Sequence, residues 1–319
     1  MSLSIAEITS RDLEEIIAFA TPFELDALQR FPAIPRPVDG ALATSIERRF
    51  EHGSGVVARQ GGAMVGLLHL IGPIPDFRPE STGIYAPLSS CLTTGDSQDR
   101  VITTMLTEVG NLPQFAGVNQ CALSCYPHNR QLNRSLALNG FGVRCADAVT
   151  LIADLPADVP DTGLTIEEIY WRDAVQIIEA KESLATHLAS SPMFMEKFAF
   201  TSEFVAWKSE ERESVHLVAR DGERIVGFIE ATYEGENYLT RSPLMRNICG
   251  AGVLPEYRNR GIMYALLIAL ANKYREEGIV SLGVDYETFN PNARRFWERY
   301  FTPYTRSWER HFDMPWGHV

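Results

Sequence analysis

Long apolar runs are missing from this chain of 319 residues, which nowhere contains a stretch of about 18 consecutive apolar residues. A helix needs roughly that length to cross a bilayer, so we expect no membrane span. The N-terminus also lacks the basic and then apolar stretch of a signal peptide. The chain is therefore expected to be cytoplasmic.

Cysteines and basic residues are also scarce. The five cysteines are odd in number and scattered, and the sequence has no paired His or Cys clusters that would make them ligands, which favours reduced thiols over a metal site. The chain has 29 Lys and Arg against 41 Asp and Glu, a net charge of −12. This balance argues against nucleic acid as a partner and is compatible with a cationic acceptor such as an amine.

The sequence repeats itself at a distance of 161 positions, so that Ile5 falls on Ile166. In one fifteen-residue window, eight aligned pairs are identical, where chance would give about one. These positions are Leu3, Ile5, Glu7, Ile8, Arg11, Asp12, Ile16 and Ile17 and their counterparts Leu164, Ile166, Glu168, Ile169, Arg172, Asp173, Ile177 and Ile178. The chain therefore consists of two homologous units, 1–155 and 156–319, with a short linker at Pro156–Asp161.

Each unit has the same predicted order of elements. In the second unit a strand (Leu164–Ile169) leads into a helix (Arg172–Glu182), and a hairpin follows over Val215–Tyr233 with Asp221-Gly222 at its turn. A strand, a helix, a further strand (Val280–Tyr286), another helix and a last strand complete the unit. This order predicts an α+β fold, a mixed and mostly antiparallel sheet flanked by helices in each unit.

The stretch Asn247–Leu267 has the features of an anion site. A short apolar strand breaks at Pro255 and passes through Arg258–Gly261 into a helix with an apolar face. Backbone N–H groups at a helix N-terminus have no intrahelical partner, and the helix dipole adds partial positive charge there. The alternative is an ordinary strand-to-helix connection with solvated arginines.

The second unit resembles the GNAT superfamily, the Gcn5-related N-acetyltransferases, over nearly all of Leu164–Phe312. The resemblance rests on the hairpin ending at Ile225–Phe228, on Gly252–Leu267 and on Asn290–Trp297. The family signature is Arg or Gln, two residues, Gly, one residue, then Gly or Ala. Here it reads Arg258–Met263, with Met263 at the last position. The chain thus resembles a tandem protein of two GNAT folds.

This resemblance implies acetyl-CoA, or another acyl-CoA, as co-substrate. The turn would hold the pyrophosphate at the helix N-terminus, and two residues before it would hydrogen-bond the pantetheine arm like an added strand. Asn290 matches the family's Asn, whose amide contacts the same arm. The implied binding residues are Val253, Leu254, Arg258, Asn259, Arg260, Gly261, Ile262, Met263 and Asn290.

The residues for acid–base chemistry are less well defined. Trp297 stands where many family members have a Tyr that protonates the departing thiolate, and an indole N–H cannot serve as that acid. Candidates for the base are Glu230, Asp285 and Glu287, with surface carboxylates as the alternative reading. Tyr300 and Tyr286 are candidates for the acid, with packed aromatic rings as the alternative. Cys249 is expected to be a small buried residue rather than a nucleophile.

Aromatic residues crowd the segment before the hairpin of the second unit. Their near-helical spacing favours a place in the core, with an apolar acceptor pocket or lid as the alternative. These aromatic residues are Phe194, Phe198, Phe200, Phe204 and Trp207, and Met195 belongs to the same group.

The first unit differs at the anion-binding turn. Ser97 aligns with Arg258, Arg100 with Gly261 and Ile102 with Met263, and the loop carries Asp96 and Asp99. We therefore expect a unit that keeps the fold and has lost acyl-CoA binding.

Together these features predict an N-acetyltransferase that moves an acetyl group from acetyl-CoA to a primary amine of a small molecule or peptide, in the C-terminal unit. A non-catalytic acyl-CoA sensor or scaffold is the alternative. A tRNA-dependent transferase is disfavoured by the acidic charge, and homodimer formation is left open.

Overall fold

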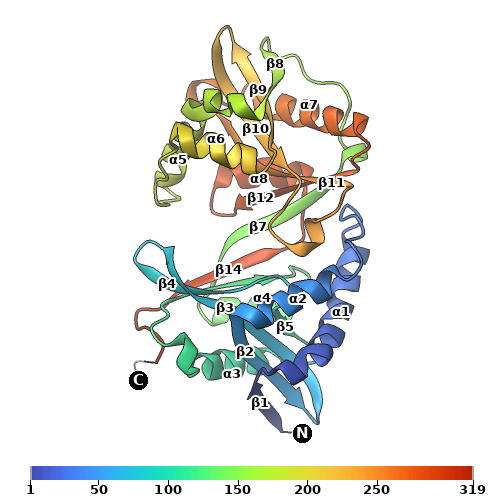
Figure 1. The fold of residues 1–319 in the computed structure, drawn as a ribbon, viewed down its shortest axis with the longest axis vertical. Helices are drawn as coiled ribbons and strands as arrows, with labels where there is room; N and C mark the ends of the chain where they lie inside the picture. The colour runs from blue at the N-terminus through green and yellow to red at the C-terminus, as the bar shows by residue number, and fades with distance from the viewer. Residues whose placement is uncertain (1, 318–319) are drawn as a thin grey trace. The chain divides into compact units, whose positions relative to one another are not determined.

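The computed structural model describes residues 2–317, which form two compact units (Figure 1). The first unit contains Asp39–Ala146, the N-terminal residues up to Phe31 and the C-terminal residues from Pro303 on. The second contains Pro32–Val38 and Asp147–Thr302. The compact units therefore differ at their ends from the two halves of the sequence repeat.

The first unit is a sheet in the order β1-β2-β3-β4-β6-β14-β7, with β5 beside β3. Neighbouring strands are antiparallel except β4 and β6, which are parallel. The strands are β1 (Leu3–Glu7), β2 (Gly53–Gln60), β3 (Ala63–Arg78), β4 (Ser81–Ala86), β5 (Cys91–Thr93), β6 (Gln120–Cys125), β7 (Gly142–Leu151) and β14 (Arg306–His311). The helices are α1 (Leu13–Arg30), α2 (Ala41–His52), α3 (Gln98–Gly110) and α4 (Arg130–Leu138). Its core includes Leu68, Ile84, Ile102 and Trp308.

The second unit repeats this plan in the order β7-β12-β11-β10-β9-β8. Strands β8 to β11 pair antiparallel, and β11 pairs parallel with β12. The strands are β8 (Thr165–Ile169), β9 (Val215–Asp221), β10 (Arg224–Thr232), β11 (Met245–Val253), β12 (Ser281–Glu287) and the short β13 (Thr302–Pro303). The helices are α5 (Ile178–Ala189), α6 (Ser202–Glu211), α7 (Ile262–Glu276) and α8 (Pro291–Tyr300). The predicted α+β fold is confirmed.

The last strand of each sequence repeat belongs wholly or partly to the other compact unit. Gly142 at the start of β7 corresponds to Pro303, at a distance of 161 positions, so β7 is the counterpart of β13 and β14. Strand β14 lies between β6 and the first part of β7, within the first unit. The second part of β7, from Asp147 on, belongs to the second unit, where β7 lies next to β12. The sequence repeat did not predict that β14 belongs to the first unit and the second part of β7 to the second.

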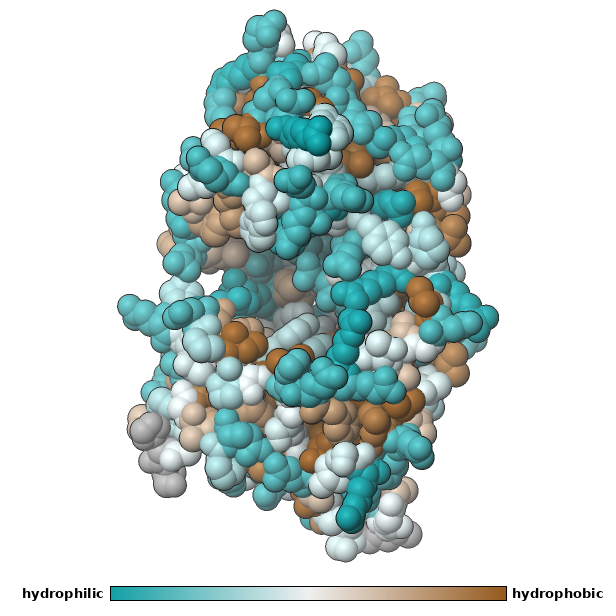
Figure 2. Space-filling view, viewed as in Figure 1, coloured by the Kyte–Doolittle hydropathy of each residue, from teal (hydrophilic) through white to brown (hydrophobic). Residues whose placement is uncertain are grey.

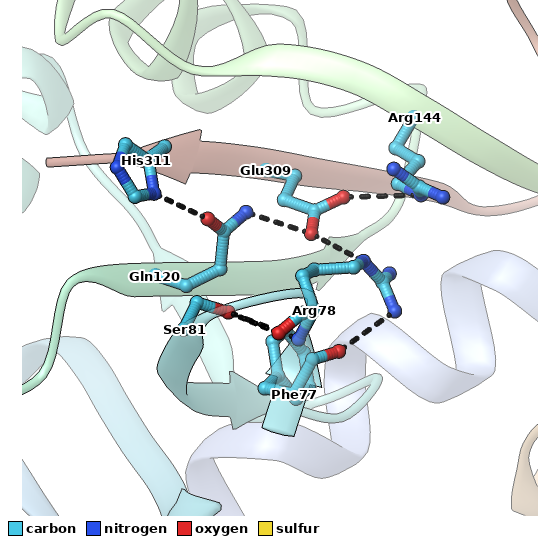
Figure 3. Close-up of polar contacts among 7 residues, drawn as sticks. All are labelled: Phe77, Arg78, Ser81, Gln120, Arg144, Glu309 and His311. Carbon is cyan, nitrogen blue, oxygen red and sulfur yellow. Dashed lines mark hydrogen bonds and ion pairs between the residues drawn. The ribbon is translucent and has the colours of Figure 1, made fainter. Parts of the chain in front are cut away.

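A polar network fixes β14 in the first unit (Figure 3). Glu309, whose side chain is 9% exposed, accepts hydrogen bonds at Oε1 from Arg78 Nε (2.8 Å) and Gln120 Nε2 (2.8 Å). Its Oε2 lies 3.1 Å from Arg144 Nε. Two strands next to β14 and the end of β3 thereby hold one buried carboxylate, and this favours a single register for the strand.

No helix within residues 2–317 is long and apolar enough to cross a membrane. The face seen in Figure 2 is mostly hydrophilic, with apolar residues in small separate groups.

Candidate functional site

The parallel strands β11 and β12 separate partway along their length. Their pairing ends at Ile248 and Val284, whereas β11 continues to Val253 and β12 to Glu287. On its other side β11 stays paired with β10 as far as Val253, with a bulge where Glu230 is followed by Ala231. A bulge bends its strand, and here the bend accompanies the separation. One edge of β11 is thereby left without a neighbouring strand.

A cavity of about 520 Å³ lies at this edge, lined only by residues of the second unit. Strand β11 contributes Ala251–Val253, and the following turn contributes Tyr257–Asn259. The first turn of α7 contributes Gly261–Tyr264. Residues of α5 and of α8, with Asn290 before it, complete the wall. The strand, the turn and the helix predicted to form an anion site thus surround one cavity.

Gly261 shapes the entry into α7. It is the N-cap residue, with φ +77°, and an added Cβ would meet no atom of the described residues within 4 Å. The first intrahelical bond to α7 runs from Ala265 N–H to Gly261 O, so the N–H groups of Ile262–Tyr264 have no partner within the helix. The first turn of α7 contains no acidic residue. These N–H groups and the helix dipole therefore favour an anion in the cavity.

The cavity carries positive charge in a chain whose net charge is −12. Its lining contains Arg258, Arg295 and Arg299 but no Asp or Glu. Arg258 donates from Nε to Val253 O at 3.1 Å, which ties the turn to the end of β11. Such a concentration of one sign attracts an anionic ligand.

Two of the nine predicted binding residues do not line this cavity. Leu254 is 2% exposed, and its N–H donates to Val226 O at 2.9 Å, so it faces β10. Arg260 turns back, donating to Glu256 O at 2.8 Å, and its guanidinium lies 5.0 Å from the centroid of the Tyr257 ring. The remaining seven residues are in the lining: Val253, Arg258, Asn259, Gly261, Ile262, Met263 and Asn290.

Asn290 also has a structural role as the N-cap of α8. Its Oδ1 accepts from the N–H of Asn292 (3.2 Å) and of Ala293 (3.3 Å), and the residue is 5% exposed. Its oxygen is thus used in the cap, whereas its Nδ2 group can donate a hydrogen bond to a ligand.

Glu230, a predicted base, lies outside the cavity lining and is already paired. Its Oε2 is 2.5 Å from Nζ of Lys181 on α5, and Glu230 is 4% exposed. Burial alone would raise the pKa of Glu230, but the charge of Lys181, followed by that of His216, outweighs burial and lowers it. Glu230 is thus an ionised structural partner, which the sequence did not reveal because Lys181 is 49 residues away.

Asp285 lies at the point where β11 and β12 separate, one residue beyond the last pair. Its side chain keeps solvent-exposed surface. Desolvation by the protein around the carboxyl, followed by the charges of Glu236 and Asp147, raises the pKa of Asp285 to about 8. Glu287 is partly buried at the end of β12. Neither carboxylate belongs to the cavity lining.

Tyr300 is the one predicted catalytic residue that lines the cavity. Its ring stacks on that of Tyr264, with centroids 4.9 Å apart and an interplanar angle of 17°. Burial raises the pKa of Tyr300, so its hydroxyl is protonated at neutral pH and can donate. Trp297 also lines the cavity and is 6% exposed. Burial raises the pKa of the Cys249 thiol to about 12, which disfavours the thiolate that a nucleophile requires.

The aromatic residues before β9 form a surface cluster, so their predicted place in the core is wrong in part. Phe198 packs against Phe200 and Phe204, each at 4.9 Å between centroids. Phe194, Phe198 and Trp207 are nevertheless 74%, 48% and 54% exposed. None of the five lines the cavity.

Comparison with known proteins gives a family and a fold. Residues 178–301 match the family model described as the acetyltransferase (GNAT) family. A tandem GNAT protein from the clavulanic acid biosynthesis pathway, solved without acetyl-CoA, is similar in structure, with a TM-score of 0.52 and 15% identity over 97% of this chain and 98% of that one. A GCN5-related N-acetyltransferase from Sphaerobacter thermophilus has a TM-score of 0.55 and 15% identity over 97% and 95%. No curated protein sequence matches the chain.

Proposed function

Because the chain belongs to the GNAT superfamily of acetyltransferases, we propose that its second unit binds acetyl-CoA in the cationic cavity and transfers the acetyl group directly to a primary amine of a small molecule or peptide. The family typically uses acetyl-CoA and an amine acceptor.

One observation carries this proposal: the start of α7 and three arginines line one cavity that has no carboxylate in its wall. Coenzyme A is a polyanion, and its pyrophosphate suits a helix N-terminus whose N–H groups are unpaired. Gly261 leaves room there because it has no side chain.

The free edge of β11 suits the amide-containing pantetheine arm. Backbone N–H and C=O groups of successive residues point to opposite edges of a strand. Since the N–H of Leu254 points toward β10, the backbone groups of Ala251 and Val253 point toward the other edge, where the cavity lies. An extended amide chain can pair with such an edge as an added strand. A backbone N–H there is also placed to donate to the thioester oxygen as it gains negative charge.

Transfer requires the amine to lose a proton as its nitrogen attacks the thioester carbon, while the C–S bond breaks and the sulfur leaves as a thiolate. We assign the base to Asp285, because its raised pKa suits proton uptake near neutral pH and its position is at the apex between β11 and β12. We assign proton donation to Tyr300, which lines the cavity and whose raised pKa keeps the hydroxyl neutral. Trp297 can hydrogen-bond but cannot take this role.

We further propose that the first unit does not bind acyl-CoA. Its counterpart of Gly261 is Arg100, which is part of α3. The first turn of α3 also contains Asp99, whose charge opposes a phosphate.

A panel of amines tests the function. Thiol release from acetyl-CoA is measured with polyamines, aminoglycosides, amino acids and peptides as acceptors, and acetyl-CoA binding is measured in parallel by calorimetry. We expect release that depends on one class of acceptor. Tight binding without release for any acceptor would contradict transfer and support a non-catalytic acyl-CoA sensor. Absence of binding would contradict the site itself.

A further inference from the structure

Two exposed arginines of α8 have no part in the predicted pyrophosphate site. Arg295 and Arg299 are four residues apart, so they project from the same side of the helix, about 6 Å apart along its axis. Both line the cavity that the start of α7 also lines. The neighbouring Arg294 does not, and it donates instead to Thr288 O at 3.0 Å.

The charges of these two arginines are not neutralised by the protein. Within residues 2–317, neither guanidinium forms an ion pair with a carboxylate, and Arg299 lies only against the ring of Tyr300, at 5.6 Å. The one acidic residue of α8 is Glu298, which accepts a hydrogen bond from Tyr286 at 3.0 Å and does not line the cavity. Two uncompensated positive charges therefore face the cavity beside the proposed acetyl-CoA site.

Coenzyme A has one phosphate more than the α7 site can account for. The N–H groups of Ile262–Tyr264, with Arg258, suit the two phosphates of the pyrophosphate. The third phosphate, on the 3′-hydroxyl of the ribose, is a terminal dianion. Guanidinium groups bind such a phosphate in a fork geometry, and two of them balance its charge.

We propose that Arg295 and Arg299 form the subsite for the 3′-phosphate of coenzyme A, so that the second unit distinguishes coenzyme A from dephospho-coenzyme A. This inference rests on the proposed function, since it requires coenzyme A in the cavity. The stack of Tyr264 on Tyr300 joins the start of α7 to the end of α8 and so fixes the spacing between the two phosphate sites. In the first unit the counterparts are Arg134 and Leu138, and Leu138 is 65% exposed, so the pair is absent there.

Calorimetry with coenzyme A and dephospho-coenzyme A tests the subsite on the full chain. Charge-assisted bonds from two guanidinium groups predict about a 10- to 100-fold preference of the unaltered protein for coenzyme A. The double variant Arg295→Ala/Arg299→Ala is expected to lose this factor for coenzyme A and to bind dephospho-coenzyme A within about twofold of the unaltered protein. Retained binding of dephospho-coenzyme A also shows that the variant is folded. Arg294→Ala, one position away on the same helix, should keep the full preference.

Each other outcome has a distinct meaning. An equal loss of both ligands in the double variant would place the arginines at the pyrophosphate and overturn the inference. Unchanged affinities would also overturn it. Failure of the unaltered protein to bind either ligand would instead contradict the proposed function.

Discussion

The two units share a fold but differ at the turn that follows their central strands. In the second unit α7 begins at Ile262, after Gly261 in the left-handed conformation. The equivalent of Ile262 is Val101, yet α3 already begins at Gln98, three residues earlier. The end of the cavity-lining turn in the second unit therefore corresponds to the first turn of helix α3 in the first unit. The proposed anion site therefore lies in the unit whose helix starts later.

The asparagine that follows β6 in the first unit and β12 in the second shows the same contrast. Asn129 and Asn290 both cap the next helix through Oδ1. Nδ2 of Asn129 additionally donates to Thr93 O at 3.2 Å, at the end of β5. The first unit thus uses this amide to bind its own backbone, whereas Asn290 lines the cavity of the second unit.

A pair of helix residues has the same positions in both units with different chemistry. Asn139 Nδ2 donates to Thr103 Oγ1 at 3.1 Å, between α4 and α3. The equivalent residues, Tyr300 and Tyr264, form the aromatic stack beside the cavity. The two helices are thus in contact at the same pair of positions in both units, through a hydrogen bond in the first and an aromatic stack in the second.

The largest effect is expected from Gly261→Glu, which should abolish acetyl-CoA binding because a carboxylate would occupy the phosphate position. Gly278 gives a matched control, since it follows the other end of α7 with the same φ of +77° and the same open space for a Cβ. Each substitution costs about 1–2 kcal/mol in stability through left-handed strain. Calorimetric titration should detect binding by Gly278→Glu alone. Binding by both variants would contradict the pyrophosphate assignment.

The next effect is expected from Asp285→Asn, which should lower kcat by about 100-fold or more through loss of the base. The pKa of Asp285 is raised to about 8, so the carboxyl is protonated at lower pH and cannot accept a proton. Activity of the unaltered protein should therefore rise with pH up to about 8. The variant should lose this part of the profile while its KM for acetyl-CoA stays the same. A profile that keeps the same rise in the variant would assign it to another group.

A smaller effect, on stability, is expected from Glu309→Gln in the first unit. The change removes the charge of the carboxylate that pairs with Arg78 and Arg144 and should cost about 2 kcal/mol in the free energy of unfolding. Glu234→Gln serves as a control, because its pair with Arg241 is 3.8 Å apart and largely exposed and should contribute little. Chemical denaturation measures both. A loss of acetyl-CoA affinity in Glu309→Gln would contradict the assignment of β14 to the scaffold of the first unit.

No effect on acetyl-CoA binding is expected from Arg100→Glu, at the first-unit position equivalent to Gly261. Titration of this variant under the conditions used for Gly261→Glu sharpens the contrast between the units. A weakened affinity would show that the first unit contributes to binding.

The strand, turn and helix start that line the cavity could be predicted from the sequence because they are consecutive. Strand, turn glycine and helix start lie within Gly252–Leu267, and local geometry alone brings them together. The sequence repeat also allowed the two units to be compared at this position. Gly261 precedes α7 in the left-handed conformation, whereas its counterpart Arg100 lies within helix α3.

The contacts that the sequence did not reveal join distant residues. Glu230 was a candidate base until the structure paired it with Lys181, and Leu254 was expected at the cavity although its N–H is bonded to β10. The place of β14 in the first unit depends on strand order, which no local pattern encodes. Arg295 and Arg299 could be recognised in the sequence as basic residues four apart on a helix. Their proposed role in ligand binding follows only from their position at the cavity.

The stoichiometry of acetyl-CoA binding to the intact chain tests the central claim most directly. A calorimetric titration should give one molecule per chain, and Gly261→Glu should remove that single binding event. Two molecules per chain, or one that persists in Gly261→Glu, would contradict the assignment of the site to the second unit.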